Sequence, residues 1–185
     1  MALQLPRRRF TTAEYHKIGE AGVLSEDDRV ELIDGEILEM SPIGSKHAAC
    51  VDRLNHVFAR NAGNRAIVRV QSPVQLGEYS EPQPDLAILR PRPDFYAPAH
   101  PGPEDVLLLV EVADTSLEYD KEKLLLYARS GVPEVWLADL KRDMLIMHRD
   151  PSPTGYETVQ VLRRGDTVSP SAFPDLEIAI ADILG

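Results

Sequence analysis

Two strongly apolar stretches frame a segment of helical character. Residues 106–110 are all aliphatic and lead into Glu111 and Val112, and residues 134–138 form a second apolar stretch. Continuous apolar runs of this length are typical of strands that are covered on both faces. Residues 119–130 predict a helix that ends at Gly131 and Pro133. Strand, helix and strand in this order predict a βαβ unit with parallel strands.

Shorter segments bounded by turn residues predict more strands around this unit. Residues 30–40 predict a β-hairpin, because Asp34-Gly35 tolerates the positive φ angles of a tight two-residue turn. A proline-rich surface loop is expected at 91–103. Other strands are expected at 66–70, 74–76, 85–89, 144–148 and 156–162, the last two paired across a turn at 151–155, and a short strand or helix at 176–184.

Helices are expected in two further places. Thr11 or Thr12 caps a short helix through about Gly19, and residues 45–62 predict a longer helix that ends at Gly63. Repeats and low-complexity segments are absent from the sequence. We therefore expect a single α/β domain over residues 1–185, with a mixed central β-sheet flanked by helices and with N-terminal and C-terminal β-hairpins.

Composition points to an ordinary globular protein. The chain has 185 residues, of which 43% are hydrophobic and 27% charged. Cys50 is the single cysteine, which excludes an internal disulfide, suits a reducing compartment and is expected to be buried. The arginines at 7–9 are not followed by an apolar run, so a signal peptide is not expected, and the apolar stretches are too short to span a bilayer. We expect a soluble, cytoplasmic protein without a membrane partner.

The net charge of −10 argues against a strongly basic nucleic-acid-binding protein. The excess of acid is not uniform along the chain. Residues 53–70 contain Arg53, Arg60, Arg65 and Arg69 and no acidic residue. Charge therefore weighs against a nucleic-acid partner without excluding one.

Two acidic residues lie where apolar strands are expected. Glu111 follows the run at 106–110, and Asp85 stands immediately before Leu86 and the rest of a short apolar strand. A buried carboxylate is costly unless it is paired or bound to a metal. Each residue taken alone has an ordinary alternative, a strand end that reaches solvent or an arginine. Two such carboxylates on adjacent strands present the hard oxygen ligands that Mg²⁺ or Mn²⁺ prefers.

A lysine near the two carboxylates would complete a hydrolytic site. Lys121 and Lys123 both lie in the helix expected after Glu111. Lys123 precedes Tyr127 by one helical turn and lies on the same side of the helix, which favours it over Lys121 for lining a cleft. Tyr127 and Trp136 are expected in the core. The sequence contains no CxxC pair, HExxH motif, glycine-rich phosphate loop or nucleophile elbow, so zinc and nucleotide enzymes of those kinds are set aside.

Four segments in this order resemble the Uma family, whose members are described as "putative restriction endonucleases" and are similar to the wider PD-(D/E)XK nuclease superfamily. The resemblance covers residues 10–139 and continues faintly to the end. The most specific segment is the last. The segments are Glu31-Leu32-Ile33-Asp34-Gly35-Glu36, Gln83-Pro84-Asp85-Leu86, Val110-Glu111-Val112, and Lys123 through Tyr127-Ala128-Arg129-Ser130-Gly131-Val132-Pro133-Glu134-Val135-Trp136.

The resemblance implies a restriction-endonuclease-like fold and a set of site residues. Asp85 and Glu111 would be the two acidic metal ligands, and Glu31 an additional N-terminal ligand. An exposed hairpin position is the alternative for Glu31. The lysine expected two places after the second acid is replaced by Ala113. In the Uma family the lysine comes from the following helix, which points to Lys123.

Two assignments stay open. The chain is one residue shorter than usual between Asp120 and Lys123, which keeps Lys121 as an alternative lysine. His47 matches a histidine near the start of the family's first long helix. A contact with a substrate phosphate at that helix N-terminus and a structural hydrogen bond are both expected possibilities for it.

Our first hypothesis is a Mg²⁺- or Mn²⁺-dependent endonuclease that hydrolyses DNA phosphodiester bonds, with Asp85, Glu111 and Glu31 holding the metal and Lys123 assisting an attacking water. A catalytically silent nuclease fold that serves as a binding or assembly module is the second, motivated by the net charge and by Ala113. A nuclease for RNA or for particular nucleic-acid structures is the third, because single strands tolerate a more acidic surface. The resemblance also implies a homodimer or higher homo-oligomer.

Overall fold

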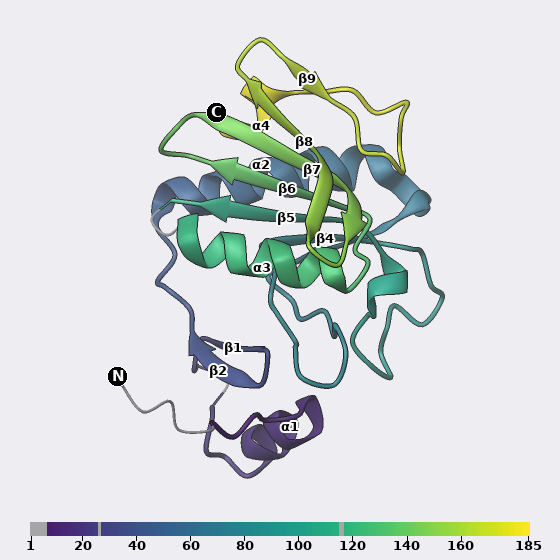
Figure 1. Cartoon of the computed structure of the whole chain (residues 1–185). Coiled ribbons are helices and arrows are strands. Elements are labelled where there is room, and N and C mark those ends of the chain that lie inside the picture. The colour runs from purple at the N-terminus through teal and green to yellow at the C-terminus, as the bar shows by residue number, and fades with distance from the viewer. Residues whose placement is uncertain (1–6, 26, 115–116) are drawn as a thin grey trace.

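A computed structural model describes residues 7–25, 27–114 and 117–185, with only the backbone described for 117–121. Its centre is a six-stranded sheet in the order β3-β4-β5-β6-β7-β8 (Figure 1). The pair β5–β6 is parallel and the other neighbours are antiparallel. The strands are β3 (Ile67–Val70), β4 (Leu86–Leu89), β5 (Val106–Ala113), β6 (Glu134–Asp139), β7 (Met144–Ser152) and β8 (Gly155–Arg163).

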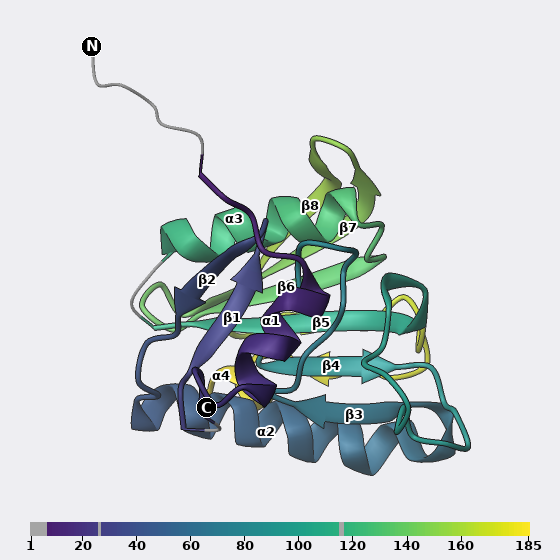
Figure 2. The same ribbon diagram turned by 90° about the horizontal axis from the view of Figure 1, so that it is seen from below.

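Helices cover both faces of this sheet. Helix α2 (Ser45–Ala62) lies on one face and α3 (Leu117–Arg129) on the other, as Figures 1 and 2 show from two directions. Successive strand residues point to opposite faces, so Leu86 and Ile88 of β4 pack on the α2 side while Ala87 and Leu89 pack on the α3 side. Because its side chains are apolar on both faces, this region reads as continuous hydrophobic runs in the sequence.

The first elements form a small layer on the α3 side of the sheet. Helix α1 (Thr12–Glu20) begins at Thr11, whose hydroxyl accepts from the Glu14 backbone N–H while the Glu14 carboxylate accepts from the Thr11 N–H. Strands β1 (Val30–Ile33) and β2 (Glu36–Glu39) pair across Asp34 and Gly35, both with positive φ. Figure 2 shows α1, β1 and β2 together across the sheet from α2.

The C-terminal segment packs on the α2 side. Strands β9 (Thr167–Val168) and β10 (Ile178–Ala179) pair with each other, and α4 (Ile180–Leu184) follows β10 directly. Ile180 and Ile183 are buried in the same cluster as Leu54 and Phe58 of α2. Two short 3₁₀ helices, η1 (Gly63–Arg65) and η2 (Pro103–Asp105), complete the elements.

Most predicted elements are confirmed, with two corrections. The strand expected at 74–76 is wrong, because the Val74 and Leu76 N–H groups donate to carbonyls of the nearby Pro82 and Ser80 rather than to a strand. The turn expected at 151–155 is shorter, since Pro151 and Ser152 still pair in β7. The expected C-terminal hairpin is β7–β8, which continues the central sheet.

Trp136 and Tyr127 are fully buried, and Cys50 is buried as expected. No helix among the described residues is long and apolar enough to cross a membrane.

His148 in β7 makes stability depend on pH. Burial lowers its pKa to about 4, and its Nε2 atom has no hydrogen-bond partner within the part of the chain that the structure describes. Between pH 6.5 and 4 the unfolded chain binds the proton and the folded chain does not, so the free energy of unfolding should fall as pH falls. With allowance for the ring's partial exposure we expect about 1–2 kcal/mol. Urea titrations at pH 7 and pH 5 measure this difference.

The variant His148→Phe keeps an aromatic ring near Tyr156, whose ring centroid lies 5.8 Å away. It should lose this part of the pH dependence. His56→Phe, at an exposed position of α2, is the control and should retain it. An unchanged slope in His148→Phe would contradict the prediction.

Candidate active site

Asp85 and Glu111 lie side by side because their strands pair. Leu86 is level with Val110 in the β4–β5 ladder, which places the preceding Asp85 beside Glu111. The Asp85 Oδ2 atom accepts a hydrogen bond from the Val112 backbone N–H at 2.9 Å. Both side chains are buried, Asp85 with 9% and Glu111 with 4% of its surface exposed. The structure therefore brings the two predicted carboxylates together.

Glu31 comes from the separate β1–β2 hairpin and is fully buried. Its Oε2 atom accepts from the Gln83 backbone N–H at 2.8 Å, and Leu32 next to it bridges to Glu81. The segment that leads into Asp85 is thus attached to β1. The alternative of an exposed hairpin position for Glu31 is wrong, because the hairpin packs its inner face against this segment.

Lys123 lies between Glu31 of the β1–β2 hairpin and Glu111 of the central sheet. Its Nζ atom is 2.8 Å from Glu111 Oε1 and 3.3 Å from Glu31 Oε2, and its side chain is only 4% exposed. One turn later the Tyr127 hydroxyl donates to Glu111 Oε1 at 2.5 Å. Residues one helical turn apart lie on the same side of a helix, so the side chains of Lys123 and Tyr127 both contact Glu111. The side chain of Lys121, the alternative lysine, lies outside the described residues.

His47 contacts Asp85 from the first turn of α2. Its Nε2 atom lies 3.0 Å from Asp85 Oδ2, while its Nδ1 atom is buried and has no hydrogen-bond partner among the described residues. The hydrogen bond to Asp85 raises the pKa of His47 against the opposing effect of burial. Of the two possibilities expected for His47, the structural hydrogen bond is present.

Gln71 contacts Asp85, and the sequence analysis did not identify this residue. It follows β3 with φ of 46°, and its amide Nε2 lies 3.3 Å from Asp85 Oδ1. A polar residue after a strand carries no periodic signal. The antiparallel pairing of β3 with β4 alone would have placed it near Asp85.

The electrostatics of the cluster favour an added cation. Burial raises the pKa of Glu111 to about 7, with Asp85 and Glu31 adding to the rise and Lys123 opposing it. Three buried carboxyl groups face one ammonium, so ionising all three would leave two negative charges without a cation. Such an excess is costly unless a further cation offsets it. Carboxylate oxygens are the ligands that Mg²⁺ and Mn²⁺ prefer.

These residues open onto a cavity of about 430 Å³. Its wall adds the acidic Glu39 and Asp114 and the basic Arg29, which donates to the Ser41 carbonyl oxygen. The cavity is large enough for a phosphate group with its waters, and its lining includes the exposed Glu39. A phosphodiester that enters it would meet the carboxylate cluster and Lys123 together.

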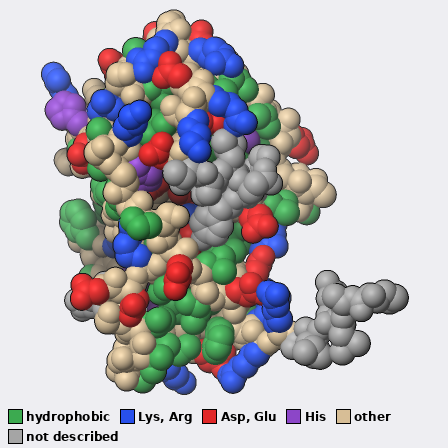
Figure 3. Space-filling model, turned by 90° about the vertical axis from the view of Figure 1, so that its left-hand side faces the viewer, with side chains coloured by type: hydrophobic (Ala, Val, Ile, Leu, Met, Phe, Trp, Pro, Cys, Tyr) green, Lys and Arg blue, Asp and Glu red, His purple; other side chains and the backbone are tan. Residues whose placement is uncertain are grey.

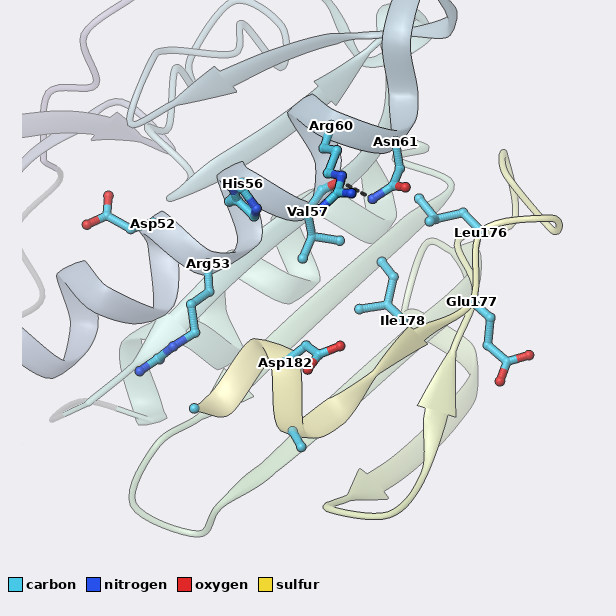
Figure 4. Close-up of a pocket in the computed structure, with 12 residues that line it drawn as sticks. Asp52, Arg53, His56, Val57, Arg60, Asn61, Leu176, Glu177, Ile178 and Asp182 are labelled. Atoms are coloured by element: carbon cyan, nitrogen blue, oxygen red, sulfur yellow. Dashed lines mark hydrogen bonds between the residues drawn. The ribbon is translucent and has the colours of Figure 1, made fainter.

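A larger cavity, of about 760 Å³, lies between α2 and the C-terminal segment. Figure 4 shows Arg53, His56 and Arg60 along α2, with Ile178 and Asp182 on the other side. Asp182 is exposed and the charges are mixed. None of the predicted site residues lines this cavity, and buried carboxylates do not occur among its lining residues. The carboxylate cluster is therefore the candidate active site.

The comparisons with known proteins agree with this fold. No curated protein matches the chain. A crystal structure described as "a putative nuclease belonging to DUF820 from Anabaena variabilis ATCC 29413" is similar, with a TM-score of 0.75, 17% identity, and coverage of 95% of this chain and 97% of that one. This likeness confirms the expected restriction-endonuclease-like fold. The profile of the Uma2 family, described as "Putative restriction endonuclease", matches residues 12–181, and the chain therefore belongs to the Uma2 family.

Proposed function

We propose that the chain is a divalent-metal-dependent endonuclease that hydrolyses DNA phosphodiester bonds. The observation that carries the proposal is the meeting of three buried carboxylates with one buried lysine at a solvent-accessible cavity. Glu31, Asp85 and Glu111 are the proposed ligands of Mg²⁺ or Mn²⁺. Membership of the Uma2 family and the similar structure support a nuclease.

Each residue has a definite task in this proposal. A bound divalent ion supplies charge for the scissile phosphate and lowers the pKa of an attacking water. Lys123 holds its ammonium at the edge of the carboxylate cluster, where it orients that water or stabilises negative charge on the phosphate. Tyr127 fixes Glu111 through its hydroxyl, and His47 with the Val112 N–H fixes Asp85. These contacts hold the carboxylates in place before substrate arrives.

Lys123 also bears on the inactive alternative. That alternative was motivated by Ala113, which stands where the superfamily has lysine. The Lys123 ammonium lies 2.8 Å from Glu111 and so supplies a cation at the cluster from the helix instead. This placement favours an active nuclease over a silent binding module.

DNA as the substrate is the finer part of the proposal, and the charges limit where it can bind. Arg65 pairs with Asp175, and Arg53 and Arg69 donate to backbone carbonyls of Leu184 and Phe95. The basic stretch at 53–70 is thus largely engaged with the chain itself. Figure 3 shows Lys and Arg side chains in the upper part of one face, over the C-terminal elements, with Asp and Glu side chains among them. Arg142 and Arg164 in this part of the chain pair with Asp139 and Asp143.

A homodimer forms part of the proposal, because two protomers can cut both strands of a duplex. Strand β8 is an edge of the described central sheet, and Val159 and Val161 on it are 54% and 50% exposed. Phe95, in the loop between β4 and η2, is 66% exposed. These apolar positions are the surfaces offered for self-association, and the molar mass in solution tests the proposal.

Cleavage of plasmid DNA, single-stranded DNA and RNA in Mg²⁺ and in Mn²⁺ tests the proposed function. We expect cleavage of DNA that EDTA abolishes. Asp85→Asn, purified identically, should fall to the EDTA level, because the amide weakens a metal ligand while it can still accept the hydrogen bond from the Val112 N–H. Preference for RNA would support the third hypothesis. Equal cleavage by both proteins would assign the activity to a contaminant, and silence of both would remove the proposal.

A further inference from the structure

A second group of metal-binding side chains lies apart from the carboxylate cluster. His16 of α1, Glu81 before β4 and His100 before η2 each present one ligand atom, and these atoms all lie within 4.8 Å of one another. His16 Nε2 is 2.9 Å from both carboxylate oxygens of Glu81. The His16 and His100 rings face each other edge to face, with centroids 6.1 Å apart.

The backbone around these three residues is held by contacts that meet at Gln75. Its backbone N–H donates to the Pro101 carbonyl at 2.9 Å, and its side-chain amide donates to the Thr12 hydroxyl at 3.1 Å. Gln75 therefore links the loop that carries His100 to the helix that carries His16. Glu81 is only 3% exposed, and its N–H donates to the Leu32 carbonyl at 2.7 Å. The three ligands thus come from three segments tied to one another.

We propose that His16, Glu81 and His100 form a second metal site, for a divalent ion of the zinc class. Two imidazole nitrogens and one carboxylate oxygen are ligands that Zn²⁺ and Co²⁺ accept in tetrahedral sites, whereas Mg²⁺ prefers oxygen alone. The site opens onto a cavity of about 480 Å³, which leaves the fourth position to water or to a small anion. Arg69 lines the same cavity and favours the anion.

The position of Glu81 gives this site a defined consequence. Glu81 and Asp85 belong to one short extended segment, Glu81-Pro82-Gln83-Pro84-Asp85, whose Gln83 N–H donates to Glu31. An ion on Glu81 would hold this segment to α1 and to the loop before η2. It would therefore fix one end of the segment that carries Asp85, without contacting the carboxylate cluster.

Titration of the tag-free full-length chain with Co²⁺, followed by its visible absorption, and with Zn²⁺, followed by calorimetry, tests the site. Glu111→Gln separates it from the carboxylate cluster and should still bind one equivalent with tetrahedral Co²⁺ absorption. In the Glu111→Gln background, His16→Gln and His100→Gln should each weaken this binding by at least about 10-fold, since each removes one of three ligands. His56→Gln on α2 is the control and should bind as before.

His100→Gln also distinguishes the site from a simple ion pair between His16 and Glu81. The side chain of His16 is 46% exposed, so neither glutamine variant removes a core residue. Binding that is lost in both variants supports the site. Equal binding by Glu111→Gln alone and by Glu111→Gln combined with His16→Gln or with His100→Gln, or no uptake by any of them, overturns it. Neither result depends on whether the chain cleaves DNA, because the readout is metal uptake alone.

Discussion

Replacing Glu111 with glutamine should lower the rate of cleavage by about 10²–10⁴-fold, because a metal ion supplies several kcal/mol of transition-state stabilisation and each 1.4 kcal/mol is tenfold in rate. The same change should leave the stability of the metal-free protein unchanged or higher. Glutamine keeps an acceptor for the Tyr127 hydroxyl and removes one of three buried carboxyl groups, each of which is costly to ionise in a buried place. Rates in Mn²⁺ and urea titrations in EDTA measure the two effects.

Glu39→Gln is the matched control for this prediction. Glu39 lines the same cavity but is exposed at the end of β2. Its substitution should therefore change neither the cleavage rate in Mn²⁺ nor the stability in EDTA greatly. A Glu111→Gln protein that unfolds more easily in EDTA would show that Glu111 is needed to compensate Lys123. A variant with full activity would remove Glu111 from the proposed metal ligands.

Lys123→Met should have the opposite effect on stability. It leaves Glu31 and Glu111 buried without the ammonium that lies 3.3 Å and 2.8 Å from them, and breaking a buried ion pair from one side costs about 3–5 kcal/mol. Cleavage should fall by about 10²–10³-fold, the usual cost of removing one group that stabilises developing negative charge. Urea titrations in EDTA and in Mn²⁺ provide the measurement, together with cleavage rates.

Mn²⁺ should restore part of the lost stability, since a divalent ion offsets the same carboxylates. Lys46→Met, at an exposed position in the first turn of α2, is the control and should lose neither stability nor activity. Full cleavage by Lys123→Met would exclude Lys123 from the reaction and leave Lys121 as the proposed lysine. A loss of stability that Mn²⁺ does not reduce would argue against a metal at Glu31 and Glu111.

Much of the fold follows from local signals in the sequence. The helix at 45–62 and the hairpin turn at Asp34-Gly35 are marked by residues that act within a few positions. The continuous apolar run of β5 marks it as a central strand. Adjacent strands then place Asp85 beside Glu111, so the two main acids could be identified together.

The remaining features depend on contacts between distant segments. The segment at 74–76 looks like a strand in isolation, but its N–H groups find loop carbonyls instead. His16, Glu81 and His100 carry no shared motif and meet only because α1 docks against two loops. The burial of Glu31 depends on the hairpin lying against the segment before β4. Patterns of hydrophobic residues do not encode such docking directions.

The four residues of the cluster come from distant parts of the chain, which has a consequence for newly made chains. Glu31 lies in β1, Asp85 immediately before β4, Glu111 in β5 and Lys123 in α3. A growing chain carries Glu31 long before the ribosome has added Lys123, so the charge cluster can close only after most of the chain has emerged. Long-range closures of this kind form late in folding. Premature termination before α3 therefore yields fragments that lack the complete cluster, whereas fragments that end after α3 contain all four residues.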